Sequence, residues 1–476
     1  MVWKSIMSRV PERAYTFLVV AGLIAFIFIL VNPLASLDLA VLGVFLLSVG
    51  HVFLREKLLL VFLLLRPTID AWRDTNLFTY QNVSVNLNAT LAILFFAWSA
   101  LMLLAYRREF TRLPMFGSGA ALGLLIIASI PRSVSSTVSF IETIKFINIL
   151  GFFWLSYLCV KTNKFSRREL VSVILLSVII PVIAALWQLV SGTGIDTADV
   201  RGRLHGTLAH PNVFAFLLLA VIIIYTHAGM IEPTKFYYTK KSIRYTLYAA
   251  LVALLLLTYT RAAYIGLGIF VTILGLFRYR QLLARVVIGV SLFFLLFYPL
   301  NQLFIHRFNV SLQEAPLLSR LTSRNEDADS LAWRQSVLRE TIPLVTARPM
   351  LGFGYGVFPL VWEENRSAAH FWEDGVEAHN DYLRLALELG LVGLAVYFMF
   401  LTRLLQHAWQ AVYTDRKINV EYLPFFAWVA VFIAVSLSDN MLNHTAVMWL
   451  TAAWWGAMLA PQAWRHKSPN LLHTHS

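Results

Sequence analysis

The sequence predicts an all-α integral membrane protein that crosses the bilayer many times. Of its 476 residues, 58% are hydrophobic and only 14% are charged, so the chain is too apolar for a soluble globular protein. Apolar runs of about 16–22 residues recur along its length, and each can cross the hydrocarbon core as one helix. Because no repeat, low-complexity tract or soluble domain interrupts them, residues 1–476 are predicted to form a single membrane domain.

The apolar runs define the transmembrane helices that we expect, about 12–14 in all. In chain order, the apolar segments are 14–32, 37–54, 57–66, 89–106, 117–131, 139–160, 170–190, 211–228, 245–260, 262–278, 286–304, 386–403, 422–438 and 445–461. The third of these is short for a span. The first begins near Ala14, is too long for a signal peptide and lacks a small-residue cleavage site, so we interpret it as a retained helix.

The basic residues predict the orientation of these helices. Those at the termini and in alternate loops are Lys4, Arg9, Arg13, Arg55, Lys57, Arg107, Arg108, Arg112, Lys161, Lys164, Arg167, Arg168, Lys240, Lys241, Arg244, Arg278, Arg280, Arg285, Arg416, Lys417, Arg465 and Lys467. The positive-inside rule assigns both termini and these loops to the cytoplasm. The loops 67–88, 191–210 and 305–385 then face outward. The net charge of +13 therefore indicates membrane topology rather than binding to nucleic acid.

The outward loop 305–385 is the longest polar segment, contains no lysine, and is expected to hold short helices and part of the active site. Helical spacing of apolar residues predicts an amphipathic helix over 330–348 on the membrane surface, which Pro343 should kink or break. The segment Pro349–Gly356 (PMLGFGYG) is predicted to be a turn. Its glycines resemble a phosphate-binding loop only superficially, because no strand precedes them.

Arg261 is the most informative single residue. It stands within Thr258–Gly266, a polar cluster inside a long apolar stretch. A guanidinium at membrane depth is costly unless it is paired or lines a wet cavity, so we interpret Arg261 as functional; the alternative is that it snorkels from a tight hairpin. Arg203, in an outward loop, supplies a second guanidinium, and such planar forks suit a phosphate. Arg201 could substitute for Arg203.

His379 is the candidate base. With Asn380 it opens a helix that continues as the span 386–403, and the positive end of the helix dipole favours a neutral imidazole that can accept a proton. The alternative is that His379 is a structural cap. His205, Asn212 and Asn380 are candidate supporting residues.

No metal ion or other cofactor is expected. The other outward histidines, His205, His210, His306, His370 and His444, include no pair with the spacing of zinc ligands. The only cysteine, Cys159, lies far away in an apolar run. The acidic segment 326–329 (EDAD) resembles a metal-binding motif of sugar-nucleotide enzymes, but no nucleotide fold surrounds it, so we interpret it as helix capping.

These motifs together resemble the O-antigen ligase and polymerase superfamily of bacterial membrane glycosyltransferases. The resemblance covers residues 200–395 and rests on three elements. They are R-x-x-G-T-x-x-x-P-N at Arg203–Asn212, T-R-x-x-x-x-G at Thr260–Gly266, and H-N-x-Y-L-x-x-x-x-E-x-G-x-x-G-L at His379–Leu394. Each element alone is weak, and the combination is fairly specific.

The resemblance implies a metal-independent enzyme of the bacterial inner membrane whose active site faces the periplasm. Its donor would be a glycan linked to undecaprenyl diphosphate, with Arg203 and Arg261 holding the diphosphate. His379 would act on the acceptor hydroxyl, which belongs to a glycan or to lipid A core. Direct displacement would invert the anomeric configuration, and a leaving diphosphate is stabilised well by fixed arginines.

This resemblance leaves three possible functions to compare. The first is a glycan transferase in O-antigen or exopolysaccharide assembly, acting as a ligase or as a polymerase. The second is a protein O-oligosaccharyltransferase of the same superfamily. The third is a non-enzymatic transporter of the lipid-linked glycan, which should place charges at mid-membrane in several spans. Because the polar residues lie outward instead, we favour the transferase.

The charge alternation makes the topology testable. A cysteine introduced by Ser367→Cys should react with a membrane-impermeant thiol reagent added outside the cell, whereas Ser242→Cys should not, because the positive-inside rule puts 305–385 outside and 240–244 inside. Labelling of intact cells and of opened membranes measures both. The opposite pattern would overturn the placement of the active site as well.

Overall fold

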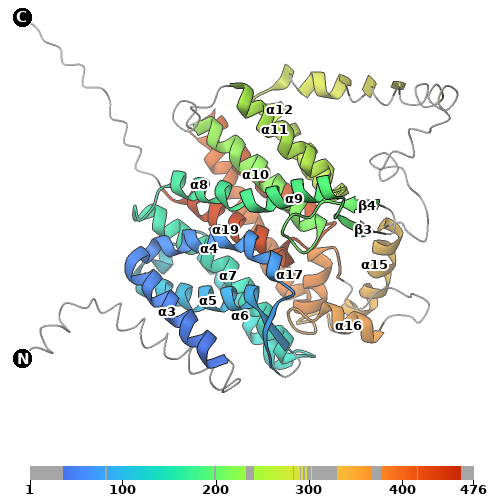
Figure 1. Ribbon diagram of the computed structural model, residues 1–476. Helices are drawn as coiled ribbons and strands as arrows, with labels where there is room; N and C mark the ends of the chain where they lie inside the picture. The colour runs from blue at the N-terminus through green and yellow to red at the C-terminus, as the bar shows by residue number, and fades with distance from the viewer. Residues whose placement is uncertain are drawn as a thin grey trace, which may run out of the picture.

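The computed structural model describes residues 36–461 except 81–82, 198–199, 232–240, 282, 290, 293–294, 297–301, 303–329, 366–376 and 415. The chain is an all-α polytopic membrane protein, in which a bundle of helices carries three small two-stranded hairpins (Figure 1). The predicted first span, 14–32, the acidic segment 326–329 and much of 286–304 lie outside the described residues.

Most of the described helices overlap the predicted apolar segments. They are α3 (Ser36–Leu54), α4 (Leu58–Ile69), α5 (Leu87–Ala105), α6 (Phe116–Ser129), α7 (Ser136–Lys161), α8 (Arg167–Ser177), α9 (Ile179–Ser191), α10 (Pro211–Ile231), α11 (Lys241–Leu256), α12 (Arg261–Phe277), α15 (Ser330–Ala347), α16 (Phe358–Asn365), α17 (Asp381–Val412), α18 (Leu423–Val435) and α19 (Thr445–Leu459). The hairpins are antiparallel: β1 (Asn76–Tyr80) with β2 (Val83–Asn86), β3 (Ile195–Thr197) with β4 (Val200–Arg203), and β5 (Tyr413–Thr414) with β6 (Lys417–Ile418).

Five stretches of these helices are long and apolar enough to cross a membrane, counting only the part of the chain that is described. They are Leu87–Ala105, Ser136–Lys161, Arg167–Ser191, Pro211–Ile231 and Asp381–Val412. Five further apolar helices are shorter, among them α11, α12 and α19. The α7 and α10 helices are the most buried of the long spans and form the centre of the bundle.

The packing of α7 against α19 shows how the centre is held. Phe95 of α5 and Phe152 of α7 stack with ring centroids 3.7 Å apart, and Trp449 of α19 packs on both rings. The two helix backbones approach closely because Gly456 has no side chain; a Cβ there would overlap the Phe153 carbonyl. Aromatic packing of this kind combines a large buried area with defined ring geometry.

The predicted span 170–190 is interrupted. The α8 helix ends at Ser177 and α9 begins at Ile179, so Val178 separates them. Pro181 explains the break, because proline has no N–H to bond the carbonyl four residues earlier. A capping box between Ser166 and Glu169 begins α8.

The α17 helix is interrupted too, at Gly390, where φ is 67° and ψ is −172°. The predicted turn 349–356 is confirmed, and it packs against this break. The Leu391 N–H donates to the Pro349 carbonyl at 2.7 Å, and the Phe353 N–H donates to the Leu387 carbonyl at 3.0 Å. The turn therefore satisfies backbone groups that the interrupted helix leaves unpaired.

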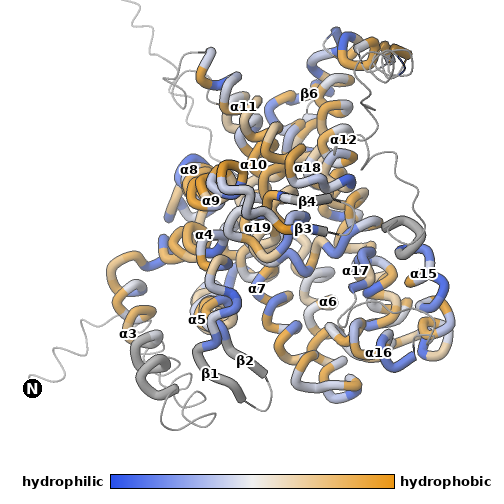
Figure 2. The backbone as a smooth tube through the Cα atoms, turned by 45° about the vertical axis from the view of Figure 1, so that its right-hand side comes forward, coloured by the Kyte–Doolittle hydropathy of each residue, from blue (hydrophilic) through white to orange (hydrophobic). Residues whose placement is uncertain are grey.

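The predicted amphipathic helix is α15, and Pro343 lies inside it without ending it. Proline removes one intrahelical bond there, and the helix continues for four more residues. Val337 of α15 is buried with Trp362 of α16 in a small second core, whereas Leu338 and Ile342 are exposed. Figures 1 and 2 show α15 and α16 beside α17 at one edge of the bundle.

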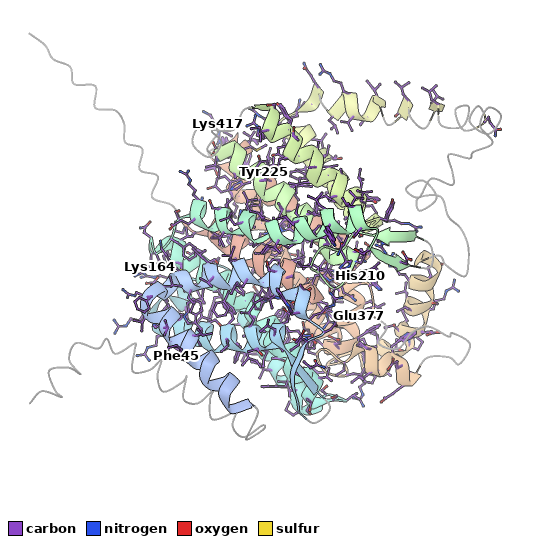
Figure 3. The ribbon with its side chains drawn as sticks, in the orientation of Figure 1. Phe45, Lys164, His210, Tyr225, Glu377 and Lys417 are labelled. Carbon is purple, nitrogen blue, oxygen red and sulfur yellow. The ribbon has the colours of Figure 1, made fainter. Side chains whose placement is uncertain are left out.

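The two classes of loop lie at opposite ends of the bundle. His210 and Glu377 belong to loops that are predicted to face outward, and Lys164 belongs to a loop that is predicted to be cytoplasmic. Figure 3 shows His210 and Glu377 near each other and Lys164 at the far end. Which end faces the periplasm stays a prediction.

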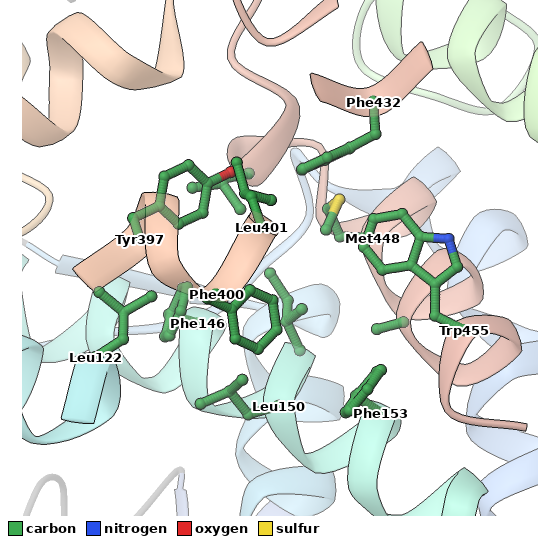
Figure 4. Close-up of a pocket in the computed structure, with 13 residues that line it drawn as sticks. Leu122, Phe146, Leu150, Phe153, Tyr397, Phe400, Leu401, Phe432, Met448 and Trp455 are labelled. Carbon is green, nitrogen blue, oxygen red and sulfur yellow. The ribbon is translucent and has the colours of Figure 1, made fainter. Parts of the chain in front are cut away.

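An apolar pocket lies inside the bundle between α6, α7, α17, α18 and α19 (Figure 4). Phe146, Tyr397, Phe400 and Trp455 are among the residues that line it. It contains none of the charged residues singled out from the sequence, so the candidate site lies elsewhere.

Gly390→Ala should destabilise the protein, because its backbone angles are restricted to glycine and a Cβ would overlap the backbone of Met350. We expect a cost of about 1–3 kcal/mol from the backbone angles alone. Gly268→Ala in α12 is the matched control, since a Cβ there meets open space and alanine favours a helix. Thermal unfolding in detergent measures both; equal stability of the two variants would contradict the interpretation.

Candidate functional site

Polar segments that are far apart in the sequence meet at one end of the bundle. The β3–β4 hairpin ends at Arg203, the turn between α11 and α12 ends at Thr260, and the segment 377–380 leads into α17. The short loop 436–444 between α18 and α19 joins them through hydrogen bonds. The site is therefore built from the ends of helices and from the loops that connect them.

Arg203 is buried among these segments, with only 4% of its surface exposed. Its Nε donates to the Thr258 carbonyl at 2.9 Å, and its Nη2 donates to Asn212 Oδ1 at 3.1 Å and to Thr260 Oγ1 at 3.3 Å. Burial lowers the pKa of Arg203 to about 10, which leaves the guanidinium charged at neutral pH. The first two predicted motifs are thus in direct contact.

Asn212 connects Arg203 to a buried carboxylate. Its Nδ2 donates to Asp439 Oδ2 at 2.9 Å. The other carboxylate oxygen, Oδ1, lies 3.0 Å from Nε2 of His444 and 3.8 Å from Nδ1 of His379. Asp439 has no exposed surface. The third motif is therefore linked to the first through Asp439 and Asn212.

The charge of Asp439 depends on the two histidines. Burial alone would raise the pKa of this carboxyl, but the contacts with His379 and His444 hold it well below its usual range. Asp439 is therefore a carboxylate at neutral pH. A buried carboxylate of this kind fixes the orientation of an imidazole and stabilises its protonated form.

His379 takes its environment from Asp439 rather than from the helix. Asn380 is the N-cap of α17, and its Oδ1 accepts the N–H groups of Tyr382 and Leu383, each at 3.0 Å. Asn380 therefore caps the helix, and His379 is the residue before the cap. Its φ of +44° is in the left-handed region, which is uncommon for residues other than glycine.

Arg261 is the first residue of α12, and it directly follows Thr260. It is half-buried at a helix end that a tight turn creates, rather than in the middle of a span. Arg203 therefore contacts the residue that directly precedes Arg261 in the chain. Arg201 lies in β4, but the position of its side chain is outside what the structure describes.

His205 supports the shape of its loop. Its Nδ1 lies 2.8 Å from the Leu208 carbonyl, and its Nε2 lies 3.1 Å from Nε2 of Gln188. Gln188 Oε1 also accepts the N–H groups of His205 and Gly206, at 3.1 and 2.9 Å. Both ring nitrogens are thereby engaged within the protein.

A second network ties α17 to the loop 436–444. Glu377 Oε2 accepts from Asn440 at 3.0 Å and from Asn443 at 2.9 Å. Arg384 donates to Asn443 and, through Nε, to Glu388 Oε1 at 3.1 Å. Arg384 and Glu388 are both buried, so each needs the other to offset its desolvation. This network fixes the part of the loop that follows Asp439.

The residues that the sequence interpretation missed lie in that loop. Asp439 was not singled out, and His444 was noted only as an outward histidine. Six of the nine residues of the segment 436–444 are polar, between two strongly apolar helices. That contrast is the signal that could have identified it.

Hydrogen bonds join the buried guanidinium of Arg203 to Asp439 through Asn212, and the imidazole of His379 lies 3.8 Å from the same carboxylate. A guanidinium can bind an anionic oxygen, and an oriented imidazole can accept a proton. Within the described residues, no group of three histidine, cysteine or acidic side chains is placed to hold a metal ion.

Comparison with known proteins gives one family. The family model described as O-antigen ligase matches residues 246–398, which include Arg261 and His379. A search of curated proteins finds no match. The match covers α11, α12, α15, α16 and the first part of α17, and it agrees with the resemblance that the sequence motifs predicted. Residues 246–398 of this membrane protein are therefore similar to the O-antigen ligase family, which supports the resemblance to the O-antigen ligase and polymerase superfamily.

Proposed function

We propose that the protein transfers a glycan from an undecaprenyl-diphosphate-linked donor to an acceptor hydroxyl at the periplasmic face of the inner membrane. The acceptor would be a glycan or lipid A core, so the enzyme would act as a polymerase or as a ligase. The single observation that supports this most is the path Arg203–Asn212–Asp439–His379. This path supports the proposal because it links a guanidinium, which suits a diphosphate, to an imidazole, which can accept a hydroxyl proton.

The donor half of the site is positive. Arg203 already uses Nε and Nη2 within the protein, and its Nη1 makes no hydrogen bond to the described residues. Arg261 supplies the second cation from the start of α12. Two fixed guanidinium groups stabilise the negative charge that develops on a leaving diphosphate. This stabilisation is stronger where water is excluded.

The acceptor half of the site is the pair of His379 and Asp439. Nδ1 of His379 is the ring nitrogen that faces the Asp439 carboxylate, and we assign acceptance of the hydroxyl proton to Nε2. As the acceptor oxygen bonds to the anomeric carbon, the carbon–oxygen bond to the diphosphate breaks and undecaprenyl diphosphate leaves with the electron pair. The hydroxyl proton passes to His379, and Asp439 stabilises the imidazolium.

The stereochemistry follows from this geometry. Direct attack in one displacement inverts the configuration at the anomeric carbon. Neither half of the proposed reaction needs a metal ion, because the guanidinium groups supply the positive charge and the imidazole accepts the proton.

His379→Ala should reduce transfer by about two to four orders of magnitude, the usual range for a general base, and should spare donor binding. Arg203→Ala should instead weaken donor binding, because it removes a cation from the diphosphate site. Donor binding and single-turnover transfer are measured on both purified variants. His407→Ala, at the other end of α17, is the control for loss of a histidine.

Thermal unfolding of the same variants separates misfolding from loss of function, since Arg203 is buried. If the folded His379→Ala protein transfers at the normal rate, His379 is a structural residue and another group must be the base. If it loses donor binding as Arg203→Ala does, His379 belongs to the diphosphate site.

Arg261→Lys should fail nearly as badly as Arg261→Ala, because a point charge cannot reproduce the bidentate geometry of a guanidinium. Arg280→Lys is the matched control, since Arg280 is exposed and its Nε donates to the carbonyl of Leu276, near the end of α12. Transfer activity at saturating donor is the measurement. Wild-type activity in Arg261→Lys would mean that Arg261 contributes only positive charge.

A further inference from the structure

His210 stands at the N-terminus of α10, directly before Pro211. Its carbonyl accepts the first intrahelical bond, from the Phe214 N–H at 3.3 Å. Its side chain also caps the helix, because Nδ1 accepts the Asn212 N–H at 3.1 Å. His210 therefore occupies the N-cap position that serine, threonine, asparagine or aspartate usually fill.

This cap fixes which ring nitrogen carries the proton. Nδ1 must be unprotonated in order to accept, so the neutral ring carries its proton on Nε2. Burial, together with the neighbouring Arg203 guanidinium, lowers the pKa of His210 to about 4. The ring is therefore neutral at physiological pH, although it keeps exposed surface.

The surroundings of His210 are those of the proposed site. The charged and titratable groups that act on it are Arg203, Asp439, His444 and His379. Asn212, whose N–H it caps, is also the residue that joins Arg203 to Asp439. Within the described residues, the Nε2–H of His210 has no hydrogen-bond partner. A neutral donor is thus accessible beside a buried guanidinium.

We propose that His210 is a further donor-binding residue, and that its Nε2–H hydrogen-bonds an oxygen of the lipid-linked diphosphate beside Arg203. The inference rests on the proposed function. The imidazole keeps its proton throughout, since the leaving diphosphate departs as an anion and the hydroxyl proton goes to His379. The role of His210 is to bind the diphosphate oxygens more tightly as their charge grows.

The competing interpretation is that His210 is only a helix cap. Three substitutions separate the two roles. His210→Asn and His210→Asp both keep a capping oxygen, but neither places an N–H donor where the imidazole has one, and the aspartate adds a negative charge. His210→Ala loses the cap and the donor together. Ser166→Ala is the control for loss of a helix cap, because Ser166 caps α8 away from the site.

The probe is undecaprenyl diphosphate without a glycan, with undecaprenyl monophosphate alongside it, bound to the full-length protein in detergent. We expect His210→Asn to weaken diphosphate binding by about 10- to 100-fold, which is the usual effect of losing one hydrogen bond to a charged group. His210→Asp should bind more weakly still, through repulsion. Thermal unfolding should be close to wild type for both variants and lowered for His210→Ala and Ser166→Ala.

The outcomes distinguish this inference from the proposed function. If His210→Asn and His210→Asp bind the diphosphate as the wild type does, while Arg203→Ala and Arg261→Ala do not, His210 is only a cap and the donor site stands. If neither arginine variant weakens binding either, the proposed donor site itself is wrong.

Discussion

The site depends on one amide side chain. Asn212 accepts from Arg203 through Oδ1 and donates to Asp439 through Nδ2, so one planar group holds a buried cation and a buried anion at a fixed separation. An amide can do this because it offers an acceptor and a donor on opposite sides. Without it, each charge would lose a hydrogen bond in a place where solvent cannot replace it, at a cost of a few kcal/mol. The loop that ends at the start of α10, where Asn212 lies, and the loop that carries Asp439 are therefore fixed relative to each other.

A second buried pair anchors the same two loops from the side of α4. Arg66 bonds Asp70 at 2.9 Å and Thr445 at 2.7 Å, and Asp70 Oδ2 accepts the Ala209 N–H at 3.1 Å. Ala209 precedes the helix cap at the start of α10, and Thr445 begins α19 just after the loop with Asp439. Buried ion pairs add little net stability, but breaking one leaves an uncompensated charge. Such pairs fix position rather than add stability, which is what a preorganised site requires.

The sequence allowed the helices and the three motif residues to be predicted, because apolar run length and motif spacing are local properties. It did not allow Asp439 to be identified, since its importance comes from contacts with residues more than two hundred positions away in one case. The break at Gly390 was missed for the same reason. It forms because the turn beginning at Pro349 supplies backbone partners there, a tertiary effect that overrides helical periodicity. The sequence alone did not show that Asn380 caps α17 and that His379 precedes this cap. The hydrogen bonds of Asn380 were needed to establish it.

The charge balance explains why two arginines are needed in the proposed reaction. Arg203 and Asp439 are linked through Asn212 and largely offset each other, so this pair alone presents little net positive charge to a ligand. A diphosphate carries at least two negative charges, and binding it next to a neutralised pair would leave them uncompensated in a place of low dielectric. Arg261 directly follows Thr260, whose hydroxyl Arg203 contacts, and would add the second positive charge in the proposed reaction. Arg203 lies outside residues 246–398 and Arg261 inside them, so the proposed diphosphate site combines the matched segment with the hairpin that precedes it.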